Sequence, residues 1–276
     1  MRITSSENNF LVLQKLFYDE STELNILEEE YGDTWVDDEF VVREGDDLPY
    51  LNELIGKSTR LKSLSLFHMQ VSNSFRDGLA ANKSIQELSI YSDPGEEGFR
   101  CLAPFFRNTN TLKELRIHEI LFNNESMKSF ASLLSQRQIK SLETICLEYV
   151  DLGDEDYVEF ARALSMQPQL ETLSLIYPNE GVNNNQDETT FSQGQIALGV
   201  TMKQWKSPCL KVLDLESSHD DFAFLVDDDG MIALEEGMAN CSNLEHLNLA
   251  GNNTITMGGP KSFIVSVPIK GIFATS

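Results

Sequence analysis

The sequence predicts an α/β solenoid in which a curved parallel β-sheet forms the concave face and helices form the convex face. Three observations lead to this prediction. A seven-residue apolar pattern, typical of a short strand, recurs seven times along the 276-residue chain. Most copies begin about 28 residues after the previous one. A helical apolar pattern precedes most copies, so strand and helix are expected to alternate.

Each strand-like segment carries apolar residues at its first, fourth and sixth positions. The segments are LKSLSLF (61–67), IQELSIY (85–91), LKELRIH (112–118), LETICLE (142–148), LETLSLI (170–176), LKVLDLE (210–216) and LEHLNLA (244–250). Because side chains alternate along a strand, the leucines are expected to face the core. Positions 3 and 5 then project from the concave sheet, and positions 7 and 8 line its rim.

The predicted helices are marked by pairs of apolar residues that are four positions apart, which is about one helical turn. These pairs are Leu51 and Ile55, Leu102 and Phe106, Phe130 and Leu134, Phe160 and Leu164, Leu198 and Met202, and Leu234 and Met238. Strand and helix each have one apolar side, so only stacking of neighbouring repeats buries both. Helices are wider than strands, and placing them all on one side is expected to bend the stack into a horseshoe.

The first part of the chain, residues 1–46, is predicted to form an N-terminal cap that shields the first layer of the core. A helix is expected over 8–18 and a degenerate first strand over 21–26. The acidic stretch 27–47 is expected to be a long loop or the edge of the cap. The repeats themselves are expected over residues 47–258.

Two further segments depart from the repeat. The Asn-rich residues 177–190 are too polar to bury much surface, so a mobile insertion is expected over about 177–195. Residues 259–276 are apolar and contain no acidic side chain. Two interpretations of this C-terminal end stay open, an irregular cap or a truncated reading frame that leaves the last repeat exposed.

The strand pattern, the repeat length and the run LEYVDLGDEDYVEFARALSMQPQLETLSL (147–175) resemble the ribonuclease-inhibitor-like class of leucine-rich repeat proteins. The resemblance covers residues 47–258 and implies the horseshoe fold. That class includes inhibitors, receptor sensor regions, ubiquitin-ligase substrate readers and GTPase activators, so the resemblance implies binding to proteins without naming a partner. The asparagine that usually follows the strand is clear only in LNLAGNNTIT (247–256).

Composition narrows the classes of partner. The net charge of −23 argues against nucleic acid and anionic membranes and fits a basic protein partner or plain solubility. The four cysteines are scattered without a C-x-x-C pair, so neither a disulfide framework nor a zinc site is expected. Without a predicted secretion signal or membrane span, a cytoplasmic monomer is expected.

Motifs for catalysis are missing from the sequence. It contains no GxSxG, GxxxxGK[ST], strand-linked GxGxxG or HExxH pattern, and its four histidines fall in separate repeats. Arg116 could be the arginine that a GTPase activator offers, yet a lone arginine on a strand is more often solvated or ion-paired. We therefore expect no enzymatic activity, no metal and no cofactor.

The acidic stretch DDDGMIALEE (227–236) partly matches a calcium-binding loop, with Gly230 at position 6. Position 1 would be Leu225, whose side chain offers no oxygen. The repeat register instead assigns Leu234 and Met238 to a helix, and aspartates are favoured where a helix begins. The stretch is therefore predicted to be the start of a helix.

A candidate binding surface follows from positions 5, 7 and 8, which carry aromatic and charged side chains on strands ~5 Å apart. Such side chains are enriched among interface anchors. Exposure is expected for the tyrosines and His118, whereas Phe67 could be exposed or packed. The candidate partner-binding residues are Phe67, His68, Tyr91, Arg116, His118, Glu148, Tyr149 and Tyr177.

Charge and surface together favour a non-enzymatic protein-binding scaffold that engages its partner through the concave face and rim. Residues 1–60 and 151–250 are strongly acidic whereas 61–150 are balanced, which suits a basic partner steered towards an aromatic centre. Two alternatives stay open. One is a GTPase-activator-like regulator, and the other is the substrate reader of a ubiquitin ligase, although the chain has no room for an F-box.

Overall fold

The structure is a computed structural model of the chain. The residues that it describes are 5–28, 39–42, 48–67, 73–120, 122, 124–135, 139–150, 154–176, 192–205, 209–216, 228–250, 252 and 271–273. All statements below concern these residues.

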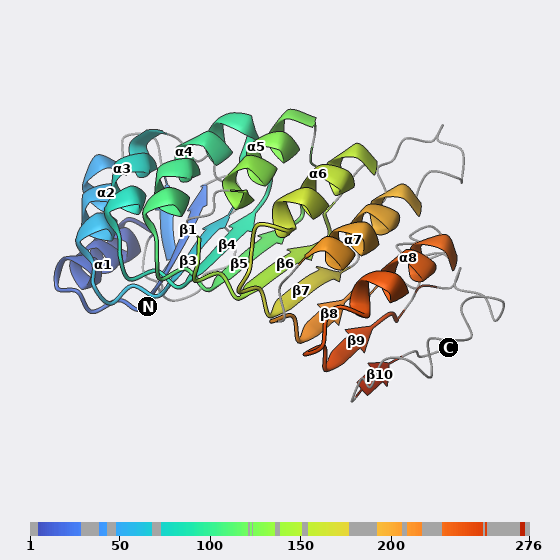
Figure 1. Ribbon diagram of the computed structural model, residues 1–276. Coiled ribbons are helices and arrows are strands. Elements are labelled where there is room, and N and C mark those ends of the chain that lie inside the picture. Colours follow the sequence, from blue (N-terminus) through green and yellow to red (C-terminus); the bar gives the residue numbers. More distant parts are fainter. Residues whose placement is uncertain are drawn as a thin grey trace.

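One sheet of ten strands runs through the molecule, in the order β10-β9-β8-β7-β6-β5-β4-β3-β1-β2 (Figure 1). Every neighbouring pair is parallel. The strands are β1 (Glu23–Glu28), β2 (Glu39–Val42), β3 (Ser63–Phe67), β4 (Glu87–Tyr91), β5 (Glu114–His118), β6 (Thr144–Glu148), β7 (Thr172–Ile176), β8 (Val212–Asp214), β9 (His246–Asn248) and β10 (Gly271–Phe273).

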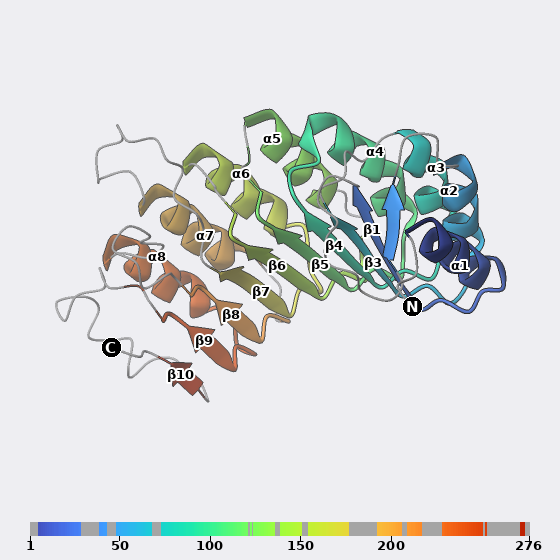
Figure 2. The same cartoon turned by 180° about the vertical axis from the view of Figure 1, so that it is seen from behind.

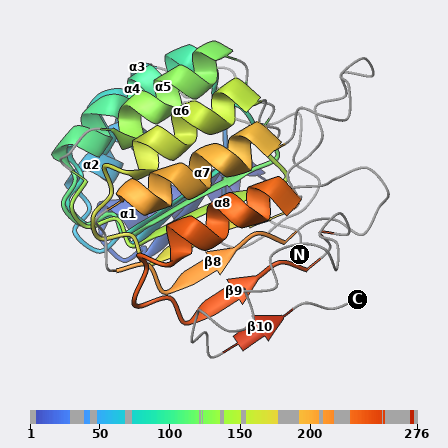
Figure 3. The ribbon, with the colours of Figure 1, turned by 45° about the vertical axis from the view of Figure 1, so that its right-hand side comes forward.

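Helices alternate with most of the strands, and all but the first pack against one another in one layer on one face of the sheet (Figure 3). The first helix lies at the end of the sheet, beside β2. The helices are α1 (Ser5–Phe17), α2 (Leu48–Lys57), α3 (Asn73–Ala81), α4 (Gly95–Asn108), α5 (Asn124–Leu134), α6 (Asp154–Leu164), α7 (Ser192–Gln204) and α8 (Asp228–Met238). We call the other face of the sheet, which no helix covers in the described part of the chain, the open face (Figure 2). The α/β alternation predicted from the sequence is confirmed.

The core is built from apolar rows that cross the sheet in register. The fourth position of the repeat pairs Leu64 with Leu88 and Leu88 with Leu115, and all three side chains are buried. The same row continues at one end to Leu24 and at the other to Ile272. Because each strand except β2 has a leucine or isoleucine at this register position, neighbouring repeats bury each other's apolar surface.

The helical side of the core is confirmed as well. Each residue of the six predicted apolar helix pairs is buried against the leucine rows. Aromatic rings fill the space between α4, α5 and α6, where Phe99 packs on Phe130 at 5.4 Å and Phe130 on Phe160 at 6.2 Å between ring centroids. No helix among the described residues is both long and apolar enough to cross a membrane.

The N-terminal segment has the predicted helix and strand, α1 and β1, and one strand that the sequence does not predict. Within the stretch expected to be a loop or cap edge, Glu39–Val42 forms β2 on the far side of β1. The side-chain amide of Asn9 donates to the Val41 carbonyl at 2.8 Å and accepts from the Val41 N–H at 2.9 Å. Asn8 donates to the Glu39 carbonyl at 2.8 Å.

At the other end, residues 271–273 form β10, another strand that the sequence does not predict. Ile272 pairs with Leu247 of β9. The rest of the predicted C-terminal end lies outside the described residues, as do residues 177–191 of the predicted insertion. The last residues of that insertion, 192–195, instead form the start of α7.

Candidate functional site

The open face of the sheet presents the odd positions of each strand. The seventh position aligns Phe67 with Tyr91, Tyr91 with His118, and His118 with Glu148, so one row crosses β3, β4, β5 and β6. This register brings together four of the residues predicted for partner binding. We call these four residues the aromatic row.

Three rings of the aromatic row are stacked. The ring centroids of Phe67 and Tyr91 are 4.1 Å apart with an interplanar angle of 9°, and those of Tyr91 and His118 are 4.4 Å apart at 5°. Parallel strands in register lie about 4.8 Å apart, which sets this spacing. The stack leaves Phe67 and Tyr91 half-buried, while His118 is 9 % exposed. The expected exposure of His118 is therefore wrong, because its ring is covered by its neighbours in the row.

His118 also contacts a carboxylate. Its Nδ1 lies 2.9 Å from Oε2 of Glu148, and its buried Nε2 has no hydrogen-bond partner within the described part of the chain. Burial lowers the pKa of His118, and the Glu148 carboxylate opposes this shift. Neutral imidazole can keep Nδ1 protonated and donate this hydrogen bond to Glu148.

The other oxygen of Glu148 is engaged as well. The Cys146 thiol, two residues earlier on β6, donates to Oε1 of Glu148 at 3.3 Å. Burial raises the pKa of this thiol to about 12, with the Glu148 carboxylate adding to the effect. A thiol in this state is a poor nucleophile, since reactivity requires the thiolate.

Arg116 lies on the same face, two residues before His118. Its Nε forms an ion pair with Oε1 of Glu114, also two residues away on β5. Positions two apart on a strand share a face, so the pair lies beside the aromatic row. The guanidinium charge is thus already matched by a carboxylate in this structure.

Tyr149 follows β6 at the rim. It has φ of 54°, in the left-handed region that non-glycine residues seldom adopt, and its N–H donates to the Ile176 carbonyl at 3.0 Å. Glu119 repeats this arrangement after β5, with φ of 55° and a hydrogen bond of 3.0 Å to the Glu148 carbonyl. Tyr149 is the first residue after β6, and its side chain is 45 % exposed. The predicted exposure of Tyr149 is confirmed.

The structure leaves two predicted residues without description. His68 and Tyr177 occupy the eighth position of their repeats, directly after β3 and β7, and both lie outside the described residues. Their part in the predicted surface stays a prediction.

Three polar residues, on β8, just after it and on β9, extend the candidate surface beyond the residues predicted from the sequence. The Glu216 N–H donates to Oδ1 of Asp214 at 3.3 Å, and Asn248 Nδ2 donates to Oε2 of Glu216 at 3.1 Å. Burial raises the pKa of Asp214, and the nearby carboxylates of Glu216 and Glu148 act in the same direction. Cys146 and Asp214 both occupy the fifth position of their repeats, which projects from the sheet, so the repeat pattern contains a signal for them.

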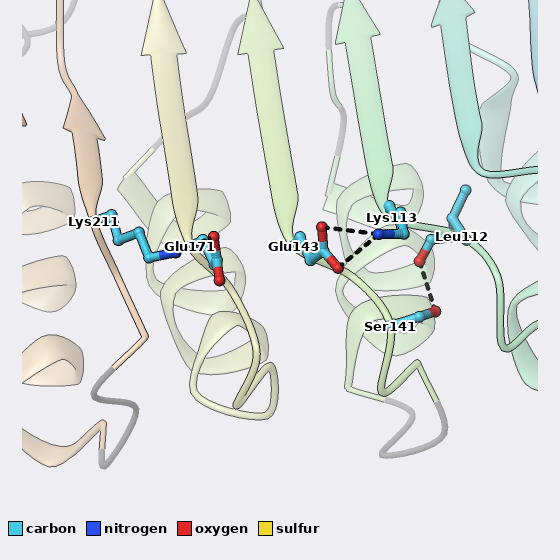
Figure 4. A network of polar contacts seen from close by, with 6 residues as sticks. All are labelled: Leu112, Lys113, Ser141, Glu143, Glu171 and Lys211. Atoms are coloured by element: carbon cyan, nitrogen blue, oxygen red, sulfur yellow. Dashed lines mark hydrogen bonds and ion pairs between the residues drawn. The ribbon is translucent and has the colours of Figure 1, made fainter. Parts of the chain in front are cut away.

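The amino ends of the strands carry a separate set of ion pairs (Figure 4). Lys113 reaches Glu143 of the next repeat at 3.1 Å, and Lys211 reaches Glu171 at 2.7 Å. Ser141 donates to the Leu112 carbonyl at 2.7 Å. The four charged side chains are about half exposed, so each ion pair contributes little to stability and mainly favours pairing of the correct neighbouring strands.

The acidic stretch 227–236 belongs almost wholly to α8, which begins at Asp228. Asp228 and Asp229 lie in its first turn, and Gly230 is buried within the helix. The predicted helix start is confirmed. Among the described residues no group of three or more His, Cys, Asp or Glu side chains is placed to hold a metal ion.

Comparison with known proteins gives no assignment, since no family model and no curated protein matches the chain.

Proposed function

We propose that the protein is a non-enzymatic protein-binding scaffold, built as a leucine-rich repeat solenoid of the ribonuclease-inhibitor-like class. Its partner binds across the open face and the adjoining rim. The observation that carries the proposal is the aromatic row, in which stacked rings and a carboxylate cross four adjacent strands instead of converging in a pocket. An extended surface of this kind suits a protein partner better than a small molecule.

The repeat class is supported by more than the leucine rows. Asn252 stands where the asparagine of such repeats is expected, and its buried amide donates to the Leu215 carbonyl at 2.7 Å and to the Leu249 carbonyl at 3.1 Å. In two earlier repeats, the corresponding residues are Ile120 and Val150, which are buried. Apolar packing there replaces the amide hydrogen bonds.

The chemistry of the partner follows from the charges beside the rings. Glu148, Asp214 and Glu216 lie on the open face, and Arg116 is balanced by Glu114. A partner that brings lysine or arginine side chains would relieve the repulsion among these carboxylates. Binding is therefore expected to weaken with salt.

Affinity capture with the whole chain tests the proposal. The wild type should retain a stoichiometric partner that the double variant Tyr91→Ala/Tyr149→Ala loses. Met166→Ala, an exposed residue in the turn after α6, is the matched control and should retain the partner. Equal capture by the wild type and the double variant, with both proteins folded by circular dichroism, would remove this surface from consideration.

A further inference from the structure

Helix α1 has apolar side chains on two faces. Val12 and Leu16 are buried in the core, whereas Phe10 and Phe17 are 67 % and 61 % exposed. A helix at the surface of a globular protein normally has a polar outer face, and one that is apolar all round is normally buried. The exposed apolar side chains of α1 therefore form a surface of the kind that a binding partner covers.

The exposed apolar residues form two rows along the outer side of the helix, with the exposed Gln14 between them and Lys15 beside the second row. Residues seven apart on a helix differ in direction by only about 20° and lie about 10 Å apart along its axis, which relates Phe10 to Phe17 and Leu11 to Tyr18. The helical turn continues to Tyr18, whose N–H donates to the Gln14 carbonyl at 3.1 Å. The Tyr18 ring packs edge-on against Phe17, at 5.2 Å between centroids. We call Phe10, Leu11, Phe17 and Tyr18 the α1 stripe.

A groove between α1 and α2 adjoins the stripe. It is lined on its apolar side by Leu16, Phe17, Tyr50 and Leu54 and on its polar side by Asp19, Glu53, Lys57 and Ser58. Phe17 belongs to both the stripe and the groove. Together they offer an elongated apolar surface at the end of the molecule where the chain begins (Figure 1).

Negative charge borders this surface. Glu20 and Glu23 are exposed just beyond α1, and Asp19 stands at the groove, where Glu53 is already paired with Lys57. Hydrogen bonds from Thr59 and Ser58 lower the pKa of Asp19 to about 2, which keeps its charge under all physiological conditions.

From the stripe, the groove and these carboxylates, we propose that the outer face of α1 is a second docking surface, which binds a basic amphipathic helix of another protein. Apolar side chains of that helix, spaced by one and two turns, would cover the α1 stripe and enter the groove. Its lysines and arginines would meet the surrounding carboxylates. This surface is separate from the open face, so either can fail a test without the other.

Charge argues against the two other occupants of an apolar face. A second copy would bring a net charge of −23 against an equal charge. An anionic membrane would repel the same carboxylates. A basic helix is the occupant whose positive side chains are attracted by these carboxylates.

Fluorescence anisotropy with labelled synthetic peptides tests the proposal on the whole chain. The probe is a peptide of about 18 residues made of leucine and lysine, with its leucines on one helical face. Two comparison peptides have the same composition in scrambled order, or glutamate in place of lysine. The facial lysine peptide should bind, more weakly at higher salt, while both comparison peptides bind at least about tenfold more weakly.

The variant Phe10→Ser/Phe17→Ser should weaken binding of the facial lysine peptide at least about tenfold. Val200→Ser on α7 and Ile232→Ser on α8, both 46 % exposed, are matched controls that should bind like the wild type. Leu11→Ser/Tyr18→Ser serves if the first variant does not fold.

Three results would overturn the proposal. Binding that both stripe variants leave unchanged would place the peptide elsewhere. Equal binding of the scrambled peptide would show that net charge alone, and not the apolar helical face, causes the binding. A wild-type dimer in sedimentation that the stripe variants convert to a monomer would make a second copy the occupant.

Discussion

His118 on β5 and Glu148 on β6 are joined by a contact of 2.9 Å between Nδ1 and Oε2, and this contact ends the stack of rings that begins at Phe67. The same carboxylate accepts the Cys146 thiol. Glu148 therefore links the aromatic part of the open face to its polar part. Its negative charge is stabilised by two buried donors, His118 and Cys146.

Stability should fall when the medium is acidified through the range where histidine titrates. Burial lowers the pKa of His118 from 6.5 in the folded state, so the unfolded chain takes up its proton first. The contribution of neutral His118 is complete above pH 6.5 and decreases as the pH falls towards the folded pKa. Urea unfolding should show a lower midpoint at about pH 5.5 than at about pH 7.5.

The variant His118→Gln should show a smaller decrease over this interval, because glutamine does not titrate. His246→Gln on β9, where the histidine is exposed, is the matched control and should keep the wild-type slope. Identical slopes for all three proteins would show that His118 does not control this pH dependence.

Cys146 should resist alkylation in the folded protein. Its thiol is buried, donates to Glu148 and has a pKa raised to about 12, so almost no thiolate forms near neutral pH. With iodoacetamide followed by mass spectrometry, the half-buried Cys209 should be labelled first and Cys146 only after denaturation. Glu148→Gln removes the negative charge beside the thiol and should accelerate labelling of Cys146. Labelling of Cys146 as fast as Cys209 in the native wild type would contradict this prediction.

Gly199→Ala should destabilise the contact between α7 and α8. An added Cβ would lie 2.3 Å from the backbone carbon and oxygen of Ala233, and neither can move away without shifting α8. Overpacking of this kind costs about 1–3 kcal/mol in the free energy of unfolding. Gly56→Ala between α2 and α3 meets its nearest atom at 3.1 Å and should cost less. The order of the two midpoints in urea unfolding checks the prediction.

Asp19→Ala should loosen the junction between the first two repeats. One carboxylate oxygen accepts from the Ser58 hydroxyl at 2.7 Å and from the Thr59 and Arg60 N–H groups at 3.0 and 3.2 Å. Its folded pKa of about 2 lies below 3.8, so its contribution is complete above pH 3.8 and is lost as the pH falls towards 2.

Because Asp19 is solvated, the expected loss at neutral pH is only about 1 kcal/mol. Thermal unfolding at about pH 7 and about pH 2.5 measures it. Wild type and Asp19→Ala should differ at the higher pH and approach each other at the lower. Glu20→Ala, one residue further on and exposed, is the control and should match the wild type at both.

The sequence predicts the regular part of this fold because two different periods mark it. Leucines that alternate along a strand and apolar pairs that are four apart on a helix specify burial without knowledge of the neighbours. This is why Leu64, Leu88 and Leu115 and their partner helices are placed correctly. The short strands β2 and β10 do not carry the full repeat pattern, and their pairing with β1 and β9 depends on contacts that the local sequence does not specify.

The site is predicted less completely, for a related reason. The repeat register identifies the positions that face outward, and it finds Tyr91, His118 and Glu148. It cannot give the burial of His118, since that depends on whether the rings of adjacent strands stack. Nor does it give the bond from Cys146 to Glu148, which is set by side-chain rotamers.

The paired amides of Asn8 and Asn9 have a consequence for how the protein behaves at high concentration. A terminal β-strand with free backbone groups is a template on which another chain can add, which starts fibril growth. At β2 the outward N–H and carbonyl of Val41 and the carbonyl of Glu39 are already occupied by α1. The beginning of the sheet is thus blocked against further strands by two asparagine side chains, and α1 protects the solubility of this end of the molecule.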